Sequence, residues 1–190
     1  MVRYSSLDCQ HHMQNISFDI LSGFLSFGHP KSVSALTLLS SGFDCGDIDL
    51  KITAGEQSCF VSFANSVNEL RDFWLFLERL ITCDGYTCLL YINQEGPEAV
   101  IVARPHGEEL SLAIIENGWY EFDPDNPEKA YKKVFNNDYS VRLNIICPKR
   151  AFISQIFNIL KKFKNATSED DYYYESAMYE NEIVKKYCEE

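Results

Sequence analysis

One fragment of the chain has residue types and spacing that could do metal chemistry: Asp49-Leu50-Lys51, within the alternating run DIDLKIT. An acid and a lysine two positions apart on a strand share one face, as in half of a metal-dependent nuclease site. Such a site needs a second carboxylate from a neighbouring strand, and Asp19 is the candidate. The alternative is that Asp49 and Lys51 are ordinary charges on an exposed strand face. The acidic balance of the chain favours this alternative, because a nuclease must hold a polyanion.

The histidines and cysteines show no spacing typical of a metal site or a catalytic triad. His11 and His12 lie together on a polar segment, while His29 and His106 stand in Gly/Pro turns. The cysteines are odd in number and form no CxxC pair; they lie at positions 9, 45, 59, 83, 88, 147 and 188. There is also no phosphate-binding loop, dinucleotide fingerprint, HExxH motif or nucleophile elbow. We therefore expect no metal, no cofactor and no catalytic residue, and cysteines that mostly pack in the core of a reduced, cytoplasmic protein.

Two clusters combine aromatic residues with acids. The first lies in a loop rich in Gly, Pro, Asn and Asp and contains Trp119, Tyr120, Glu121, Phe122, Asp123 and Asp125. The second lies nearer the C-terminus and contains Asp170, Asp171, Tyr172, Tyr173 and Tyr174. Aromatic side chains give a large contact area at low entropic cost, and acids speed encounter with a basic partner. The alternatives are that Trp119 and Phe122 fold back onto the core and that the second cluster is part of a disordered tail.

Composition limits the possible classes of protein. The 190 residues are 46% hydrophobic and 14% aromatic, which is enough for a packed core in one domain. The net charge of −11 argues against binding to nucleic acid or to an anionic membrane surface and favours a basic protein partner. The N-terminus has no apolar run typical of a signal peptide, and no window is typical of a membrane span.

The element around which the rest can be arranged is a helix predicted over Ser66–Thr82. Ser66 and Glu69 form a capping box. At 100° per residue one broad arc is apolar and contains Val67, Leu70, Phe73, Trp74, Leu77, Leu80 and Ile81. We interpret Trp74 as a core residue, because its neighbours on the arc are all aliphatic or phenylalanine.

Strand-like runs surround this helix. Alternation predicts strands over 47–53 and 57–63, joined as a hairpin, and further strands over 86–92, 99–103, 110–115 and 139–146. The run 86–92 is nearly all apolar, which is typical of a central strand. A second amphipathic helix is predicted over 149–164. The pattern indicates an α+β fold: an antiparallel sheet of six to eight strands with two main amphipathic helices on one face. We divide the chain into a loose segment 1–14, a single domain 15–165 and an acidic, tyrosine-rich appendage 166–190.

The pattern over residues 46–164 resembles the small acidic immunity proteins of bacterial polymorphic-toxin and contact-dependent inhibition systems. The resemblance is carried by the hairpin leading into SVNELRDFWLFLERLI, then by YTCLLYINQEGPEAVIVAR and LSLAIIENG, and by the closing amphipathic helix. It implies a cytoplasmic, non-enzymatic protein that binds and neutralises one cognate toxin domain, often a basic nuclease. The family has no shared catalytic motif, so no residue roles are carried over.

Three functions stay open at this point. The favoured one is an immunity-type protein that binds a basic toxin domain, with Trp119, Tyr120, Glu121, Asp123, Asp125, Asp170, Asp171, Tyr172 and Tyr173 as partner-binding residues. The second is a small-molecule-binding or regulatory domain. The third is a metal-dependent enzyme that uses Asp19 and Asp49.

Overall fold

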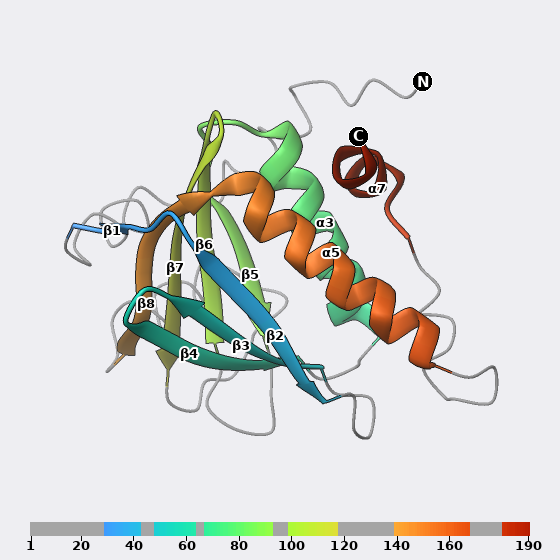
Figure 1. Ribbon diagram of the computed structural model, residues 1–190, viewed down its shortest axis with the longest axis horizontal. Helices are drawn as coiled ribbons and strands as arrows, with labels where there is room; N and C mark the ends of the chain where they lie inside the picture. Colours follow the sequence, from blue (N-terminus) through green and yellow to red (C-terminus); the bar gives the residue numbers. More distant parts are fainter. Residues whose placement is uncertain (1–28, 43–47, 64–66, 93–98, 118–138, 168–179) are drawn as a thin grey trace, which may run out of the picture.

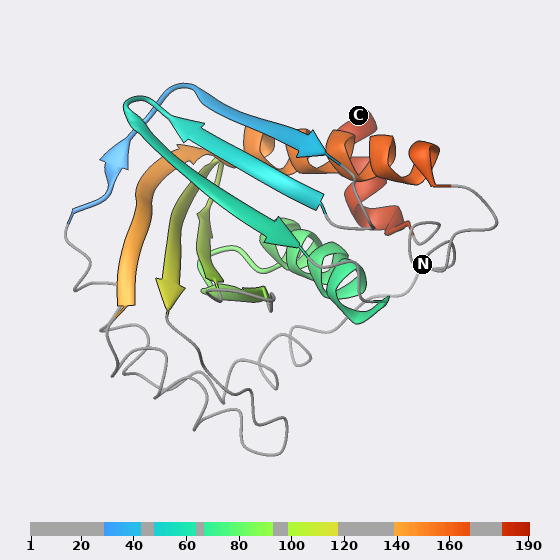
Figure 2. The same cartoon turned by 90° about the horizontal axis from the view of Figure 1, so that it is seen from below.

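In the described part of the chain, eight strands and three helices surround one hydrophobic core (Figure 1). The computed structural model describes residues 29–42, 48–63, 67–92, 99–117, 139–167 and 180–190. The strands form a five-stranded mixed sheet and a three-stranded antiparallel sheet. Seen from below, the strands of the small sheet run at an angle to those of the large one (Figure 2). The predicted α+β class is confirmed, and the strands prove to be divided between two sheets.

The small sheet contains, in spatial order, β2 (Leu36–Gly42), β3 (Ile48–Ala54) and β4 (Gln57–Phe63). Its inner face is apolar, because every second residue of β3 is buried, as the alternation in DIDLKIT predicts. Gly55 and Glu56 alone connect β3 to β4. Gly55 has a φ of 60°, which a two-residue hairpin turn of this hand requires and which glycine adopts without steric cost.

The large sheet contains, from edge to edge, β1 (Lys31–Ser32), β8 (Tyr139–Pro148), β7 (Glu109–Asn117), β6 (Ala99–His106) and β5 (Cys88–Ile92). β5 to β8 pair antiparallel, whereas β1 pairs parallel with the end of β8. Among the described strands β5 lies at an edge, although its apolar run is typical of a central strand. Its inward residues are still buried, because α3 (Val67–Thr82) packs against it.

Two helices close the core. α3 packs against β5 and β6, and α5 (Lys149–Ala166) packs against β2 and β8. Trp74 of α3 meets Phe157 of α5 edge to face, with ring centroids 6.1 Å apart, which confirms its interpretation as a core residue. Phe76 is also buried, although it lies outside the predicted apolar arc. It is covered because α3 has neighbours on more than one side.

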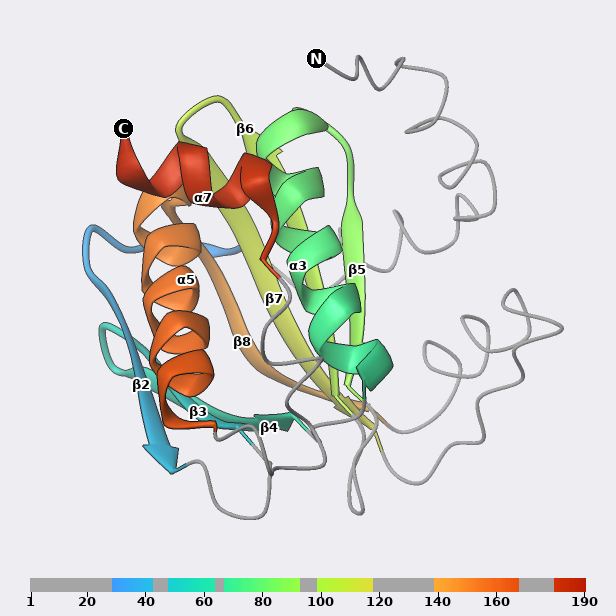
Figure 3. The ribbon, with the colours of Figure 1, turned by 90° about the vertical axis from the view of Figure 1, so that its right-hand side faces the viewer.

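A third helix, α7 (Glu182–Glu189), lies across α3 and α5 (Figure 3). Val184, at its centre, is completely buried and belongs to the same core as the two sheets. Asn181 caps α7 by accepting hydrogen bonds from the backbone N–H groups of Ile183 and Val184. The amide nitrogen of Asn181 donates to Glu78 of α3 at 2.5 Å. Residues 180–190 are thus joined to the rest of the fold by both apolar and polar contacts.

Candidate interaction surface

The side of the small sheet that faces away from the core carries a row of three side chains from three strands. Leu39 of β2 is in register with Lys51 of β3, and Lys51 is in register with Phe60 of β4. We call these three residues the central row. The ammonium nitrogen of Lys51 lies 5.5 Å from the centre of the Phe60 ring, which is a cation–π distance. Cross-strand neighbours on one face are the contacts that order a sheet surface.

The two outer members of the central row are apolar and exposed. Phe60 is 69% exposed and Leu39 is 58% exposed. Four large hydrophobic residues are exposed in the part of the chain that the structure describes, and two of them stand in this row; the other two are Tyr86 and Val141. Aromatic residues such as Phe60 are enriched at protein–protein interfaces. The sheet holds both anchors on regular strands, so little order would have to be gained on binding.

Polar side chains flank the central row. On one side, Thr37, Thr53 and Ser58 form a hydroxyl row in the same register. On the other side, Asp49 of β3 is in register with Ser62 of β4. An apolar centre with a polar, solvent-accessible rim is the usual anatomy of a protein interface. The arrangement can therefore bury Phe60 and Leu39 while the rim supplies hydrogen bonds.

The small sheet is anchored to α5 by a side chain that behaves like an additional strand. The carboxamide of Gln155 accepts a hydrogen bond from the N–H of Leu38 at 2.8 Å and donates one to the C=O of Leu36 at 2.9 Å. A third bond, to the C=O of Ala151 one turn earlier, fixes the carboxamide on α5. Both groups on β2 belong to the edge that faces away from β3, so Gln155 satisfies two outward groups of that edge and occupies the place of another strand there.

The acid and lysine of the hypothetical metal site both lie on the outer face of the small sheet. Asp49 is exposed and Lys51 is half-buried. The second carboxylate, Asp19, lies outside the described residues. Within the described ranges, no three His, Cys, Asp or Glu side chains are close enough together to hold a metal ion. Within the described residues, the position of Lys51 is better explained by its contact with the Phe60 ring than by a catalytic role.

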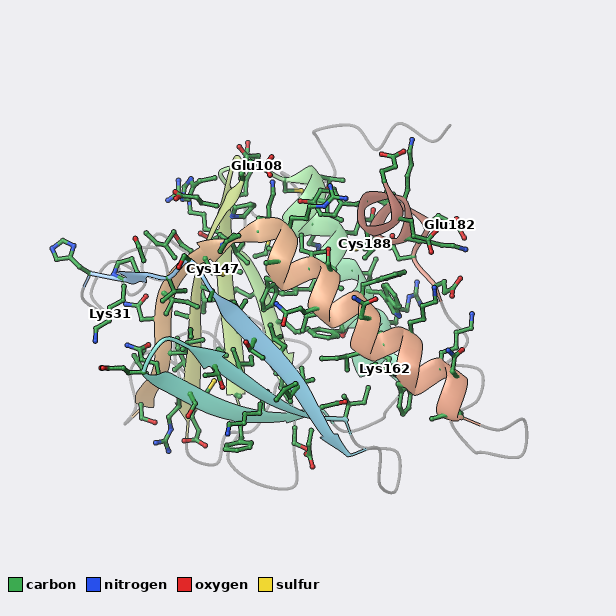
Figure 4. All side chains as sticks on the ribbon, viewed as in Figure 1. Lys31, Glu108, Cys147, Lys162, Glu182 and Cys188 are labelled. Carbon is green, nitrogen blue, oxygen red and sulfur yellow. The ribbon has the colours of Figure 1, made fainter. Side chains whose placement is uncertain are left out.

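Four of the described cysteines are free thiols, and three of these are buried. Burial raises the pKa of Cys59 and of Cys88 to about 11, and that of Cys147 to about 12. These thiols are protonated at neutral pH and are therefore poor nucleophiles. Cys188 is half-buried on the side of α7 that faces α5, and burial raises its pKa as well (Figure 4).

Cys83 differs from these four cysteines, because it is disulfide-bonded. The scattered spacing of the cysteines did not predict this bond. Disulfides persist mainly in oxidising compartments. The cytoplasmic location therefore stays a prediction.

Both predicted partner-binding clusters lie outside the described residues. The first, from Trp119 to Asp125, falls within residues 118–138, and the second, from Asp170 to Tyr174, falls within 168–179. The charge of the chain is nevertheless distributed unevenly around the described fold. The described ranges contain thirteen Lys and Arg and thirteen Asp and Glu, so the net charge of −11 falls entirely on the other segments. Residues 118–138 contribute a net charge of −2 and residues 168–179 contribute −4, so about half of the excess charge belongs to the segments that contain the two clusters.

In comparisons with models of protein families, with curated proteins and with solved structures, no match to this chain is found. Separately, none of the helices in the described ranges has the length and apolar character needed to cross a membrane.

Sequence reasoning missed the central row, although a signal for it was present. Residues 57–63 were predicted as the partner strand of 47–53, but no face was assigned to Phe60. In the register that the two-residue turn imposes, Cys59 and Val61 point inward and Phe60 must point outward. The contact between Gln155 and β2 spans more than a hundred positions and has no local signal.

Proposed function

We propose that this chain is a non-enzymatic protein that binds another protein stoichiometrically through the outer face of its small sheet. The observation that carries the proposal is the exposed central row, in which Phe60 and Leu39 stand on either side of Lys51 on regular strands. An anchor of this kind loses its exposed apolar area on binding, which favours association by about 25 cal/mol per Å² before ordering costs.

The partner that best fits the charge of the chain is a basic protein domain. The described ranges are electrically balanced and the other segments carry eleven excess negative charges, so approach of a basic surface is favoured at long range. In this proposal the acidic segments 118–138 and 168–179 speed encounter, and Phe60 and Leu39 hold the complex after contact. The resemblance to immunity proteins suggests which basic protein this is: a toxin domain, for example a nuclease, that is neutralised by binding.

The test begins with tagged protein used to capture partners from the native host at low and then at high salt. A captured basic protein is purified, its affinity for this chain is measured by calorimetry, and its enzymatic activity is assayed with increasing amounts of this chain. We expect inhibition that is complete at equimolar ratio. Phe60→Ala should weaken the affinity about thirtyfold or more, as for a central aromatic anchor.

Tyr86→Ala is the matched control, because Tyr86 is also an exposed aromatic residue but lies on the loop after α3, away from the small sheet. It should leave the affinity unchanged. Equal affinities for the native chain and Phe60→Ala would remove the small sheet from the binding surface. If this chain binds the captured protein without inhibiting its enzymatic activity, the neutralising role is refuted and only the binding function is supported.

A further inference from the structure

The edge of β4 that faces away from β3 carries unused hydrogen-bonding groups. The turn of two residues makes Ala54 and Gln57 a hydrogen-bonded pair, and bonding then recurs at every second residue of β4. The backbone N–H and C=O groups of Ser58, Phe60 and Ser62 must therefore point away from β3. No described strand pairs with β4 on that side.

This edge lacks the features that normally protect an edge strand. β4 has the sequence QSCFVSF, which contains no charged residue and no proline. The opposite edge of the same sheet is satisfied by Gln155, whereas Ser58 and Phe60 at the β4 edge are exposed. β8 lies near β4, yet no backbone hydrogen bond joins these two strands in the described part of the chain. In the described ranges the outward backbone groups of β4 therefore make no hydrogen bond to a neighbouring strand.

The side chains of β4 are complementary to those of an antiparallel copy of the same strand. Ser58 and Ser62 stand at equal distances on either side of Phe60, and the inward positions between them are Cys59 and Val61. An antiparallel pairing centred on Phe60 places Ser58 of one copy opposite Ser62 of the other. It also places the two Phe60 rings side by side and Cys59 opposite Val61, and no charges of like sign meet across the new pair.

We propose that β4 pairs antiparallel with β4 of a second copy of this chain, with the two-fold axis at Phe60. The two small sheets then form one continuous six-stranded sheet whose ends are both closed by Gln155. Such a contact is isologous and closes on itself, so it gives a dimer and not a fibre. The two central rows become one, because each Phe60 stays on the outer face beside its own Lys51. The pairing uses the edge of β4, whereas the proposed basic partner would bind the outer face, and Phe60 belongs to both surfaces.

The test uses charges placed at Ser58 and Ser62, which face each other only in this register. In S58K/S62K, each new lysine lies opposite a new lysine of the second copy. In S58K/S62E, each lysine lies opposite a glutamate. Within one copy the two positions are too far apart along the strand to interact, so the folded monomers should be equally stable. S58K/S62K also lowers the net negative charge of each chain, so a loss of dimer cannot come from general repulsion.

Sedimentation equilibrium of the native chain should show a dimer in equilibrium with monomer. S58K/S62K should dimerise at least about tenfold more weakly than the native chain, and S58K/S62E at least as strongly. Circular dichroism and thermal unfolding verify that both variants fold. Should the lysine variant not fold, Ser62→Pro removes one outward N–H at an edge position where proline is tolerated and should also give monomer.

A native chain that stays monomeric at all accessible concentrations would overturn the proposal. The same holds if S58K/S62E is as monomeric as S58K/S62K, because the register centred on Phe60 would then be wrong. The proposed partner function fails by a different result, since it is read from the affinity of Phe60→Ala for the basic protein. If S58K/S62E dimerises but binds no basic protein, the result supports the dimer and contradicts the proposed partner function.

Discussion

Replacing Gln155 with leucine tests how the small sheet is held against the helices. The Gln155 carboxamide makes two hydrogen bonds to the β2 edge, to the N–H of Leu38 and the C=O of Leu36. Each contributes about 1 kcal/mol net, and each backbone group left without a partner costs somewhat more where water cannot reach it. The site is partly buried, so water replaces part of the loss. We expect Gln155→Leu to lower the free energy of unfolding by about 2 kcal/mol.

The measurement is urea unfolding followed by fluorescence, with thermal unfolding as a second readout. A loss of this size lowers the melting temperature of a chain of this length by about 4–8 °C. Asn158→Leu is the matched control, because Asn158 is an exposed amide on the same helix and its replacement should change stability by less than about 0.5 kcal/mol. Gln155→Glu should lie between the two at neutral pH, because its carboxylate still accepts from Leu38 but has no proton for Leu36.

A second consequence separates this account from a general loss of packing. Without the carboxamide, the edge of β2 becomes an unpaired strand edge, so Gln155→Leu should associate in a concentration-dependent way even with S58K/S62K in the same chain. If Gln155→Leu unfolds at the same urea concentration as the native chain, the two hydrogen bonds do not anchor β2, and the description of Gln155 as a substitute strand is refuted.

Three further predictions concern α7 and the thiols. Asn181→Ala should lower the free energy of unfolding by about 1–2 kcal/mol, measured by urea unfolding, because it removes the cap of α7 and a bond to α3. With iodoacetamide at pH 8, mass spectrometry should find Cys188 modified well before Cys147, whose pKa burial raises to about 12; equal rates would contradict this. The hydrogen bond from Lys164 lowers the pKa of Glu180, so its stabilisation is present above pH 4.5, the ordinary value, and is lost as pH falls through the lowered pKa. Glu180→Gln should therefore lose less stability on acidification, as followed by urea unfolding at pH 3 to 7.

The parts of the fold that depend on local pattern were predictable. The alternation around Leu50 fixed which residues of β3 are buried, and the apolar arc around Leu77 fixed the inner face of α3. The same reasoning could not divide the strands into two sheets. That division depends on which strand edges meet, for instance Lys31 beside Ile145, and such pairings join residues far apart in the sequence.

The candidate surface was less predictable than the fold. Aromatic residues in a loop, such as Trp119, attract attention because the surrounding residues are polar. Phe60 was harder to notice, because an aromatic residue within a strand is normally taken as core. Its exposure follows only from the register with Lys51, which the turn at Gly55 determines. The unpaired edge of β4 at Ser58 likewise cannot be identified until the strands that pair with β4 are known.

The position of α7 has a consequence for how the molecule is made. Asn181 and Glu78 are 103 positions apart, and α3, which ends at Thr82, is complete long before residues 180–190 are synthesised. Until then the part of α3 that packs against α7 is uncovered. Contacts of such long separation form late and slowly. A nascent chain at this stage therefore exposes a surface that a chaperone can recognise, and a stop codon shortly before Val184 should yield protein that aggregates or is degraded.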